Sequence, residues 1–358
     1  MYFLIVSDRE YKKTSRGMDL ITTLLSEKGH QIDHLVFFKR KKFQERHVSN
    51  NIRQIYFYDP LKLYRSRLQF LFPGFILISY FRYIIRKQTT INFINYDYVI
   101  LESGHPNYLA LEINNKIIYR QSDSVYISFN SNRTFYKKLE EMVINRSIIT
   151  TSAINGKFFP IQYKDKFIFW HSGFIPFRNT DVIKTTNSIV IIGDKVDWKL
   201  INKISKKFTE YNFNMITTSK RRIKNKNVII KGYLEYNEYL KTISSSRAVI
   251  IPYSKRFAYQ SRQHSFTAKI LVPMSMGLPI LLSAYGMVQK SDPEKKLFVY
   301  ESHKDAICLF EDIINRVIHN EFTREVSKET QDFLRPQMYE NRMKELNSFF
   351  ENILNQKT

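Results

Sequence analysis

The chain of 358 residues has a single cysteine, Cys308, and lacks several signatures of metal and cofactor sites. One thiol forms no internal disulfide and no cysteine-rich metal site, and it fits a reducing cytoplasm. There is no Asp-x-Asp carboxylate pair for a divalent ion, and no expected helix carries a histidine pair. Gly-rich phosphate loops of the NTPase or dinucleotide type are also missing. We therefore expect no metal ion and no resident cofactor.

Acidic residues are scarce. Asp and Glu number 33 against 56 Lys and Arg, which gives a formal net charge of +23. Such an excess attracts polyanions, whether nucleic acid, anionic lipid headgroups or phosphorylated substrates. No zinc-finger spacing, aromatic RNA-binding signature or heptad-bearing basic helix occurs, so we expect no nucleic-acid partner.

Long apolar runs are absent as well. The uncharged run 68–81 is too short to span a bilayer, and Pro73-Gly74 interrupts it. Residues 60–96 contain no acid, while lysines and arginines flank an aromatic-rich middle. This composition predicts that segment 61–87 associates with the membrane interface, its aromatic residues inward and its arginines on anionic headgroups. The alternative is a helix of the first domain with an ordinary buried face.

The N-terminal sequence MYFLIVSDRE has no basic leader and reaches an acid after a few apolar residues. It predicts a first β-strand rather than a signal peptide. Together with segment 61–87, this start leads us to expect a cytoplasmic protein that is bound peripherally to the inner face of the cell membrane.

The length exceeds the size at which one core usually stops growing, which predicts two domains. Short apolar strands alternate with helices, and the pattern restarts after a polar linker at 174–187, as in parallel sheets buried on both faces. We predict an α/β protein with two doubly wound, Rossmann-like domains facing across a cleft, at 1–176 and 177–335. We expect a C-terminal helix in 336–358 to pack back on the first domain. The predicted strands are 2–6, 31–38, 52–58, 96–102, 116–120 and 147–153, followed by SIVII, FNMITTS, NVIIKGY, RAVIIPY, PILLS and LFVY.

The most informative segments are NVIIKGYLEYNEYLKTISSSRAVIIPY (227–253) and AKILVPMSMGLPIL (268–281). They give, in order, a strand ending in glycine and a hydrophobic residue, a short helix, a strand ending in Pro-Tyr, and a helix closed by Gly-Leu-Pro. This ordered set resembles the second domain of glycosyltransferases with the B-type two-Rossmann fold, whereas the first half shares only the general order. The resemblance implies sugar transfer from a nucleotide diphosphate, bound by 177–335, to an acceptor bound by 1–176.

The start of the helix before Gly-Leu-Pro is the expected diphosphate site. A helix N-terminus supplies free N–H groups and a positive dipole end, and a lysine there adds a full charge. The sequence SFTAK places Ser265, Thr267 and Lys269 in that position, and Tyr253 would close over the same pocket. The alternatives are a solvent-facing helix lysine for Lys269 and a structural tyrosine at a strand end for Tyr253.

Two further glycine turns are expected on the donor side. Gly193 follows the first strand of the second series, and Gly232-Tyr233 would border the nucleotide base of a donor that we expect to be UDP-linked. The alternative for Gly232 is a simple turn glycine.

The subfamily bears on stereochemistry. Many retaining enzymes of this fold carry two glutamates, and the equivalent places here hold Ser265 and Pro273. The chain looks more like the inverting, xanthan-type glucuronosyltransferases, which act at the inner membrane face on a polyprenyl-diphosphate-linked saccharide. Val272 departs from that pattern, because a polar, glutamine-like contact to the donor is expected there. The transferred sugar, with a uronic acid as one option, therefore stays open.

An inverting transfer needs a general base in the first domain. Asp123 in YRQSDSV follows a strand where the xanthan-type family places an aspartate of this role, and the alternative is an Asx-turn or a helix cap. Asp8, after the first strand, and Glu102 are rivals for the role. The residues expected to bind the acceptor are Arg16, Gly17, Glu102 and His105.

The sequence thus predicts an inverting, metal-independent glycosyltransferase that moves a sugar to a lipid-linked or nascent cell-surface saccharide. Three alternatives stay open. A nucleotide-sugar epimerase of the same fold would need no acceptor and no membrane segment, a retaining glycosyltransferase would use another mechanism, and a basic adaptor would bind no nucleotide sugar.

Overall fold

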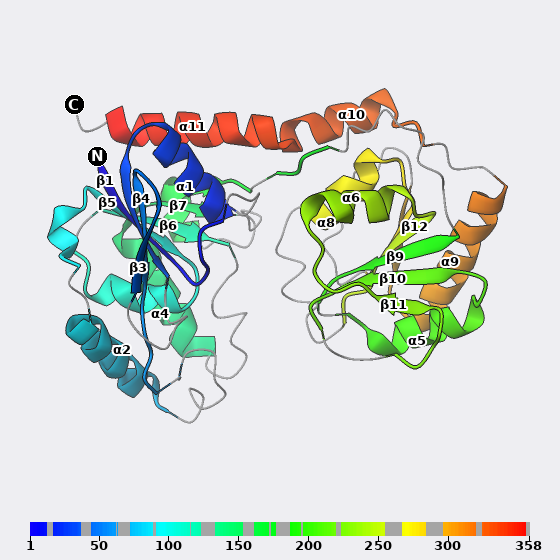
Figure 1. Cartoon of the computed structure of the whole chain (residues 1–358), viewed down its shortest axis with the longest axis horizontal. Helices are drawn as coiled ribbons and strands as arrows, with labels where there is room; N and C mark the ends of the chain where they lie inside the picture. The colour runs from blue at the N-terminus through cyan, green and yellow to red at the C-terminus, as the bar shows by residue number, and fades with distance from the viewer. Residues whose placement is uncertain are drawn as a thin grey trace. The chain divides into compact units, whose positions relative to one another are not determined.

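The computed structural model describes residues 1–12, 17–36, 44–61, 63, 72–88, 91–114, 116–122, 133–152, 161–171, 173–176, 187–194, 196–219, 223–254, 267–283, 296–319 and 324–355. The chain forms two compact units (Figure 1). Unit 1 comprises Met1–Ser172 and Arg342–Thr358, and unit 2 comprises Gly173–Asn341. The chain thus passes from unit 1 to unit 2 after Ser172 and returns to unit 1 at Arg342.

Unit 1 is built on an eight-stranded sheet in the order β3-β4-β2-β1-β5-β6-β7-β8. Its neighbouring strands are parallel, except that β3 runs antiparallel to β4. The strands are β1 (Tyr2–Ser7), β2 (Gln31–Val36), β3 (Gln44–Ser49), β4 (Ile52–Tyr56), β5 (Tyr98–Glu102), β6 (Lys116–Gln121), β7 (Ser147–Ser152) and β8 (Phe167–Phe169). The helices are α1 (Gly17–Glu27), α2 (Gly74–Gln88), η2 (Phe93–Asn95), η3 (His105–Leu111), α4 (Arg133–Arg146), η5 (Ile161–Lys166) and α11 (Tyr339–Asn355).

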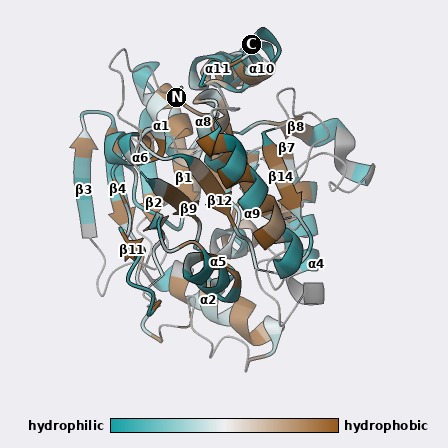
Figure 2. Cartoon of the chain, turned by 90° about the vertical axis from the view of Figure 1, so that its right-hand side faces the viewer, coloured by the Kyte–Doolittle hydropathy of each residue, from teal (hydrophilic) through white to brown (hydrophobic). Residues whose placement is uncertain are grey.

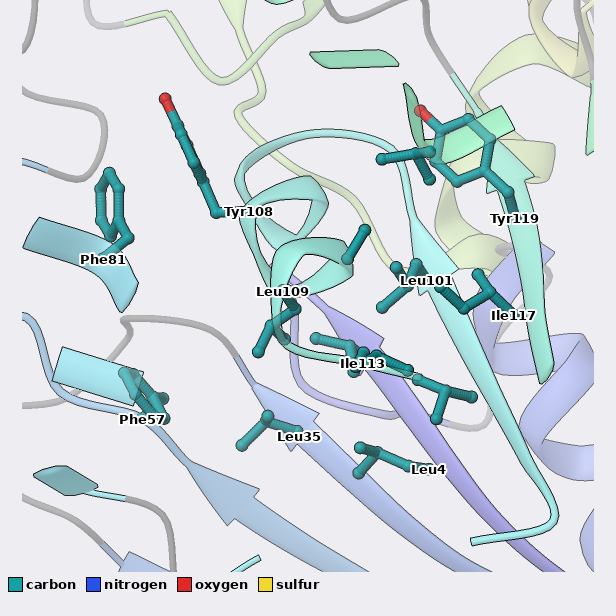
Figure 3. Close-up of a cluster of buried hydrophobic side chains, with 14 of the residues drawn as sticks. Leu4, Leu35, Phe57, Phe81, Leu101, Tyr108, Leu109, Ile113, Ile117 and Tyr119 are labelled. Atoms are coloured by element: carbon teal, nitrogen blue, oxygen red, sulfur yellow. The ribbon is translucent and has the colours of Figure 1, made fainter. Parts of the chain in front are cut away.

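Strand β1 is buried on both faces, as expected for a central parallel strand. On one face, Leu4 joins a core that includes side chains of α2 and η3. Figure 3 shows this core, in which Phe81 of α2 lies beside Tyr108 of η3, with ring centroids 4.5 Å apart. On the other face, Phe3 stacks on Tyr98 at 5.6 Å.

The end of the chain belongs to unit 1. The indole Nε1 of Trp170 donates to the carbonyl oxygen of Arg342 at 2.8 Å, and Lys28 pairs with Glu351 at 2.9 Å. Phe350 on α11 is fully buried. These contacts place the C-terminal part of α11 on unit 1.

Unit 2 is built on a six-stranded parallel sheet in the order β11-β10-β9-β12-β13-β14. This is the 3-2-1-4-5-6 order of the Rossmann fold. The strands are β9 (Ser188–Ile192), β10 (Asn212–Ile216), β11 (Val228–Ile230), β12 (Ala248–Ile251), β13 (Ile280–Ser283) and β14 (Leu297–Tyr300). The helices are α5 (Trp198–Lys207), α6 (Tyr236–Ser244), α8 (Ala268–Ser275), α9 (His303–Ile318), α10 (Lys328–Leu334) and η7 (Arg335–Gln337).

Helices cover both faces of this second sheet. Alternate side chains of β9 point to opposite faces: Ile189 and Ile191 pack in a core with α5 and α9, while Val190 and Ile192 pack in another with α6 and α8. In Figure 2 the central strands β9 and β12 are brown, whereas α5 is mostly teal, which is the pattern of an outer helix on a buried sheet. The predicted α/β class with two doubly wound domains is confirmed.

Segment 61–87 forms a helix in its second half, and residues 62 and 64–71 lie outside the described part. The inner face of α2 places Leu77, Phe81 and Ile84 in the core of unit 1, so the helix has the ordinary buried face that was the alternative expectation. Its arginines Arg82 and Arg86 both bond Glu112, so a distant acid supplies the partner that the segment itself lacks. None of the helices in the described residues is long and apolar enough to cross a bilayer.

Candidate functional site

The strand order of unit 2 reverses between β9 and β12, which makes this pair the topological switch point. In open α/β sheets, ligands bind beyond the carboxyl ends of the strands at such a point. Residues 193–194 and 196–197 follow β9, residues 252–254 follow β12, and residues 267–269 begin α8, the helix between β12 and β13. The sequence-predicted donor residues Gly193, Tyr253 and Lys269 therefore belong to one edge of one sheet.

The segment after β9 turns sharply at Gly193. Its φ of +145° is one that residues with a Cβ rarely adopt, and its N–H donates to the carbonyl of Ile216 on β10 at 3.2 Å. Val196 then pairs with Tyr253 in an antiparallel bridge, and the N–H of Asp197 donates to the Pro252 carbonyl at 2.7 Å. The loop after β9 is thus joined to the loop after β12.

The N-terminus of α5 is closed by the protein itself. Oδ1 of Asp197 accepts hydrogen bonds from the N–H groups of Lys199 and Leu200, each at 3.1 Å. Its other oxygen lies 2.7 Å from Nε2 of His303, the first residue of α9. Because a carboxylate already satisfies the first turn of α5, that helix offers no anion site.

The N-terminus of α8 differs. Thr267 is its N-cap, but the Thr267 side chain makes no capping hydrogen bond. The hydroxyl of Thr267 is buried and has no hydrogen-bond partner in the described part of the chain. The first N–H groups of a helix have no partner within the helix, and here the cap side chain does not supply one. The start of α8 is therefore suited to an external anion.

Lys269, the second residue of α8, is half-buried, and its ammonium lies 6.0 Å from the ring centroid of Tyr253. The lysine therefore points toward the strand ends rather than along the outer surface of the helix. Tyr253 is in turn bridged to Val196, so the lysine lies at the same sheet edge as the segment after β9. Ser265, the third residue expected here, lies outside the described residues.

Sequence reasoning missed Asp194, which follows Gly193 in the same turn. Its Oδ1 accepts hydrogen bonds from the backbone N–H of Thr218 at 2.6 Å, the Thr218 hydroxyl at 2.9 Å and the Thr217 hydroxyl at 3.3 Å. Partial burial acts to raise the pKa of Asp194, but the bonds from Thr218 and the charge of Lys269 outweigh it, so the pKa is lowered. An ionised carboxylate therefore lies within the electrostatic reach of the lysine.

The turn after β11 is more open. Gly232 has a φ of +75°, with no atom within 4 Å of the position of a Cβ, and the neighbouring Tyr233 is 75% exposed. The turn follows β11, which is separated from β9 by β10. The expected contact of Tyr233 with a nucleotide base stays a prediction.

In unit 1, the strand order reverses between β1 and β5. Ser7, at the end of β1, donates its hydroxyl proton to the carboxylate of Glu102, at the end of β5, at 2.5 Å, and both residues are buried. Gly17 opens α1 against Arg120 of β6, whose Nη2 would lie 2.7 Å from a Cβ at this position. Glu102 and Gly17 thus belong to the strand ends where the acceptor is expected.

The remaining acceptor-side predictions are only partly described. His105 is the first residue of η3, but its side chain is not among those described. Arg16 and Asp123 lie outside the described residues, so the predicted general base has no structural account. In the described part of the chain, no group of three or more His, Cys, Asp or Glu residues is placed to hold a metal ion.

Comparisons with known proteins find the fold but no sequence family. No family profile and no curated protein matches the chain. Sucrose-phosphate synthase of Thermosynechococcus elongatus matches at a TM-score of 0.68 and 10% identity, covering 99% of both chains. HepE of Anabaena, in complex with UDP and glucose, matches at 0.61 and 10%, again over 99% of both chains. A UDP-forming α,α-trehalose-phosphate synthase of Burkholderia vietnamiensis matches at 0.58 and 9%, covering 99% of this chain and 100% of the other.

These likenesses confirm the B-type two-Rossmann fold that the sequence predicts. The switch point of unit 2 combines an uncapped helix start, a half-buried lysine, a tyrosine and an ionised aspartate. The helix start and the lysine can bind a diphosphate, and the aspartate can accept hydrogen bonds from hydroxyl groups.

Proposed function

We propose that this protein is a glycosyltransferase that takes a sugar from a nucleotide diphosphate, UDP-linked, bound at the switch point of unit 2. The observation that carries the proposal is the contrast between two helix starts. Asp197 closes α5, whereas α8 begins without a side-chain cap and with Lys269 in its first turn. Two of the solved structures that share the fold are a UDP complex and a UDP-forming synthase, which supports the choice of nucleotide.

In this proposal Lys269 and the start of α8 stabilise the leaving group. When the bond between the anomeric carbon and the diphosphate breaks, negative charge grows on the departing nucleoside diphosphate. A cation and helix N–H groups aimed at that charge bind the transition state more tightly than the ground state, which is what accelerates the step. The half-burial of Lys269 limits screening of its charge by water.

On the acceptor side we propose an inverting transfer. A general base removes the proton of the acceptor hydroxyl while its oxygen attacks the anomeric carbon from the face opposite the diphosphate. Asp123 is the candidate base, on its place after β6 and on the resemblance to the xanthan-type enzymes. The buried pair of Ser7 and Glu102 would position this end of the sheet.

We further propose a lipid-linked saccharide as acceptor, reached at the inner membrane surface through the outer face of α2. Phe75 and Tyr83 on this face are 70% and 60% exposed, and Phe72 precedes the helix with 38% exposure. Arg82 and Arg86 already pair with Glu112. Insertion of the aromatic rings would therefore contribute more to membrane binding than attraction of these arginines to lipid headgroups.

A calorimetric and thermal-shift panel tests the donor. The wild-type protein should bind UDP and at least one UDP-sugar and release UDP when an acceptor is added. Conversion of a free nucleotide sugar without an acceptor would favour an epimerase. Failure to bind any nucleotide diphosphate would contradict the proposal and favour a basic adaptor.

Co-sedimentation with vesicles containing phosphatidylglycerol tests the membrane surface. The double substitution Phe75→Ser and Tyr83→Ser should reduce the bound fraction several-fold. Ile318→Ser serves as the matched control, because Ile318 is a 55% exposed apolar side chain of unit 2. Equal binding of wild type and the double variant would contradict the claim that the outer face of α2 binds the membrane.

A further inference from the structure

Asp194 is an acid in a site that has to receive an anion. Its carboxylate stands at the end of β9, within the electrostatic reach of Lys269. A second negative charge next to a diphosphate weakens the attraction that the lysine supplies. Asp194 is exposed, so a bound donor can reach its carboxylate.

The hydrogen bonds of Asp194 show which oxygen is available. All three bonds from Thr217 and Thr218 end on Oδ1. In the described part of the chain, Oδ2 makes no hydrogen bond. The side chain is thus fixed through one oxygen by the end of β10 and keeps the other for a ligand.

The position of Asp194 limits what that ligand is. Lys269 lies over the ring of Tyr253, and Tyr253 is bridged to Val196, two residues beyond Asp194. A diphosphate held by Lys269 and the start of α8 would carry the sugar on one phosphate and the nucleoside on the other. With the sugar rather than the nucleoside on the side of β9, the first sugar ring is the part of the donor that Asp194 contacts.

We infer that Asp194 selects a donor whose sugar is uncharged or amino-substituted and rejects a uronic acid. This inference rests on the proposed function and deepens it. A carboxylate accepts hydrogen bonds from sugar hydroxyl groups and attracts an ammonium, but it repels the carboxylate of a uronate at short range. It thus decides against the uronic acid that the sequence resemblance left open.

The substitution Asp194→Asn separates the charge from the structural role. Asparagine keeps an oxygen that accepts the hydrogen bonds of Thr218, so the turn after Gly193 is preserved, while the negative charge is lost. Asp312→Asn is the matched control, because Asp312 is a 53% exposed aspartate of α9 that pairs with Arg316. A thermal melt of each variant verifies that the fold is retained.

The experiment is calorimetric titration of wild type and both variants with UDP, UDP-glucose and UDP-glucuronate at low salt. Wild type should bind UDP-glucose about tenfold or more tighter than UDP-glucuronate, as expected for one like-charge contact. Asp194→Asn should bring this ratio to within about threefold and leave binding of UDP unchanged or slightly tighter. The control should behave as wild type.

Two results overturn the inference while leaving the donor site intact. One is an unchanged ratio in Asp194→Asn, and the other is a wild-type preference for UDP-glucuronate. If wild type does not bind UDP or either sugar, the proposed donor site itself is wrong and the inference falls with it.

Discussion

Replacing Asp33 by asparagine should destabilise unit 1 by about 2–3 kcal/mol. The side chain of Asp33, on β2, is 2% exposed. Its Oδ2 accepts bonds from the hydroxyls of Tyr2 and Tyr96 and from Nη2 of Arg53, each at 2.5 Å, and its Oδ1 accepts from Nε of Arg53 at 2.7 Å. One carboxylate therefore joins β1, β2, β4 and the segment before β5.

The magnitude follows from what asparagine cannot do. Its amide group would face donors of Tyr2, Tyr96 and Arg53, so at least one buried donor would lose its acceptor. Breaking a fully buried ion pair costs about 3–5 kcal/mol. The side chain of Arg53 is 33% exposed and keeps part of its hydration, which lowers the expected cost to about 2–3 kcal/mol.

The effect should depend on pH in one direction. Burial acts to raise the pKa of Asp33, but the hydrogen bonds from Arg53, Tyr2 and Tyr96 outweigh it, and the pKa is lowered from 3.8. The folded state thus binds this proton less readily than the unfolded state. The contribution of Asp33 is complete above the unfolded pKa and is lost as the pH falls through the lower folded value.

Urea denaturation followed by tryptophan fluorescence measures this difference. In a Trp198→Phe background the remaining indole, Trp170, reports on unit 1. The free-energy gap between wild type and Asp33→Asn should be constant between about pH 7 and 5 and shrink below about pH 4. A gap under about 1 kcal/mol at pH 7, or one that widens in acid, would refute the reasoning.

Two glycine substitutions should also destabilise the fold. Gly277 follows α8 with a φ of +64°, and Gly277→Ala would place a Cβ 2.7 Å from the backbone oxygen of Arg324. We expect the free energy of unfolding of unit 2, measured by urea denaturation, to fall by about 2–4 kcal/mol. A fall below about 0.5 kcal/mol would contradict this packing. Gly17→Ala would push on the guanidinium of Arg120, which is buried with its Cζ 5.1 Å from the ring of Trp170. We expect a loss of about 1–2 kcal/mol and a shifted Trp170 emission, and an unchanged spectrum would argue against the contact.

The sequence predicts most of the fold because central parallel strands are continuous apolar runs. Strands such as β1 and β9 are found where the apolar runs occur. The sequence did not predict β3 because QERHVS is a polar strand at the edge of the sheet, beside β4. It did not predict β8 because three residues are too few to show the alternation of a strand. Which face of α2 is buried depends on its packing against η3, and the amino-acid composition of the segment does not show this packing.

The candidate site was predicted unevenly. Lys269 and Tyr253 follow from the order of strand, helix and Gly-Leu-Pro, which is local in the sequence. Asp194 did not stand out, because an aspartate after a glycine is a common turn. Its role depends on Thr218, which follows strand β10, and on Lys269, which lies far along the chain. Only the folded sheet brings these residues near Asp194.

The affinity for UDP of wild type, Lys269→Ala and Lys304→Ala tests the central claim most directly. Lys269 and Lys304 are each the second residue of a helix, α8 and α9, but α9 follows the edge strand β14 rather than the switch point. Loss of one charged contact to phosphate should weaken binding by about ten- to a hundredfold in Lys269→Ala. Lys304→Ala should bind as wild type, and equal affinities in all three proteins would contradict the donor site at the start of α8.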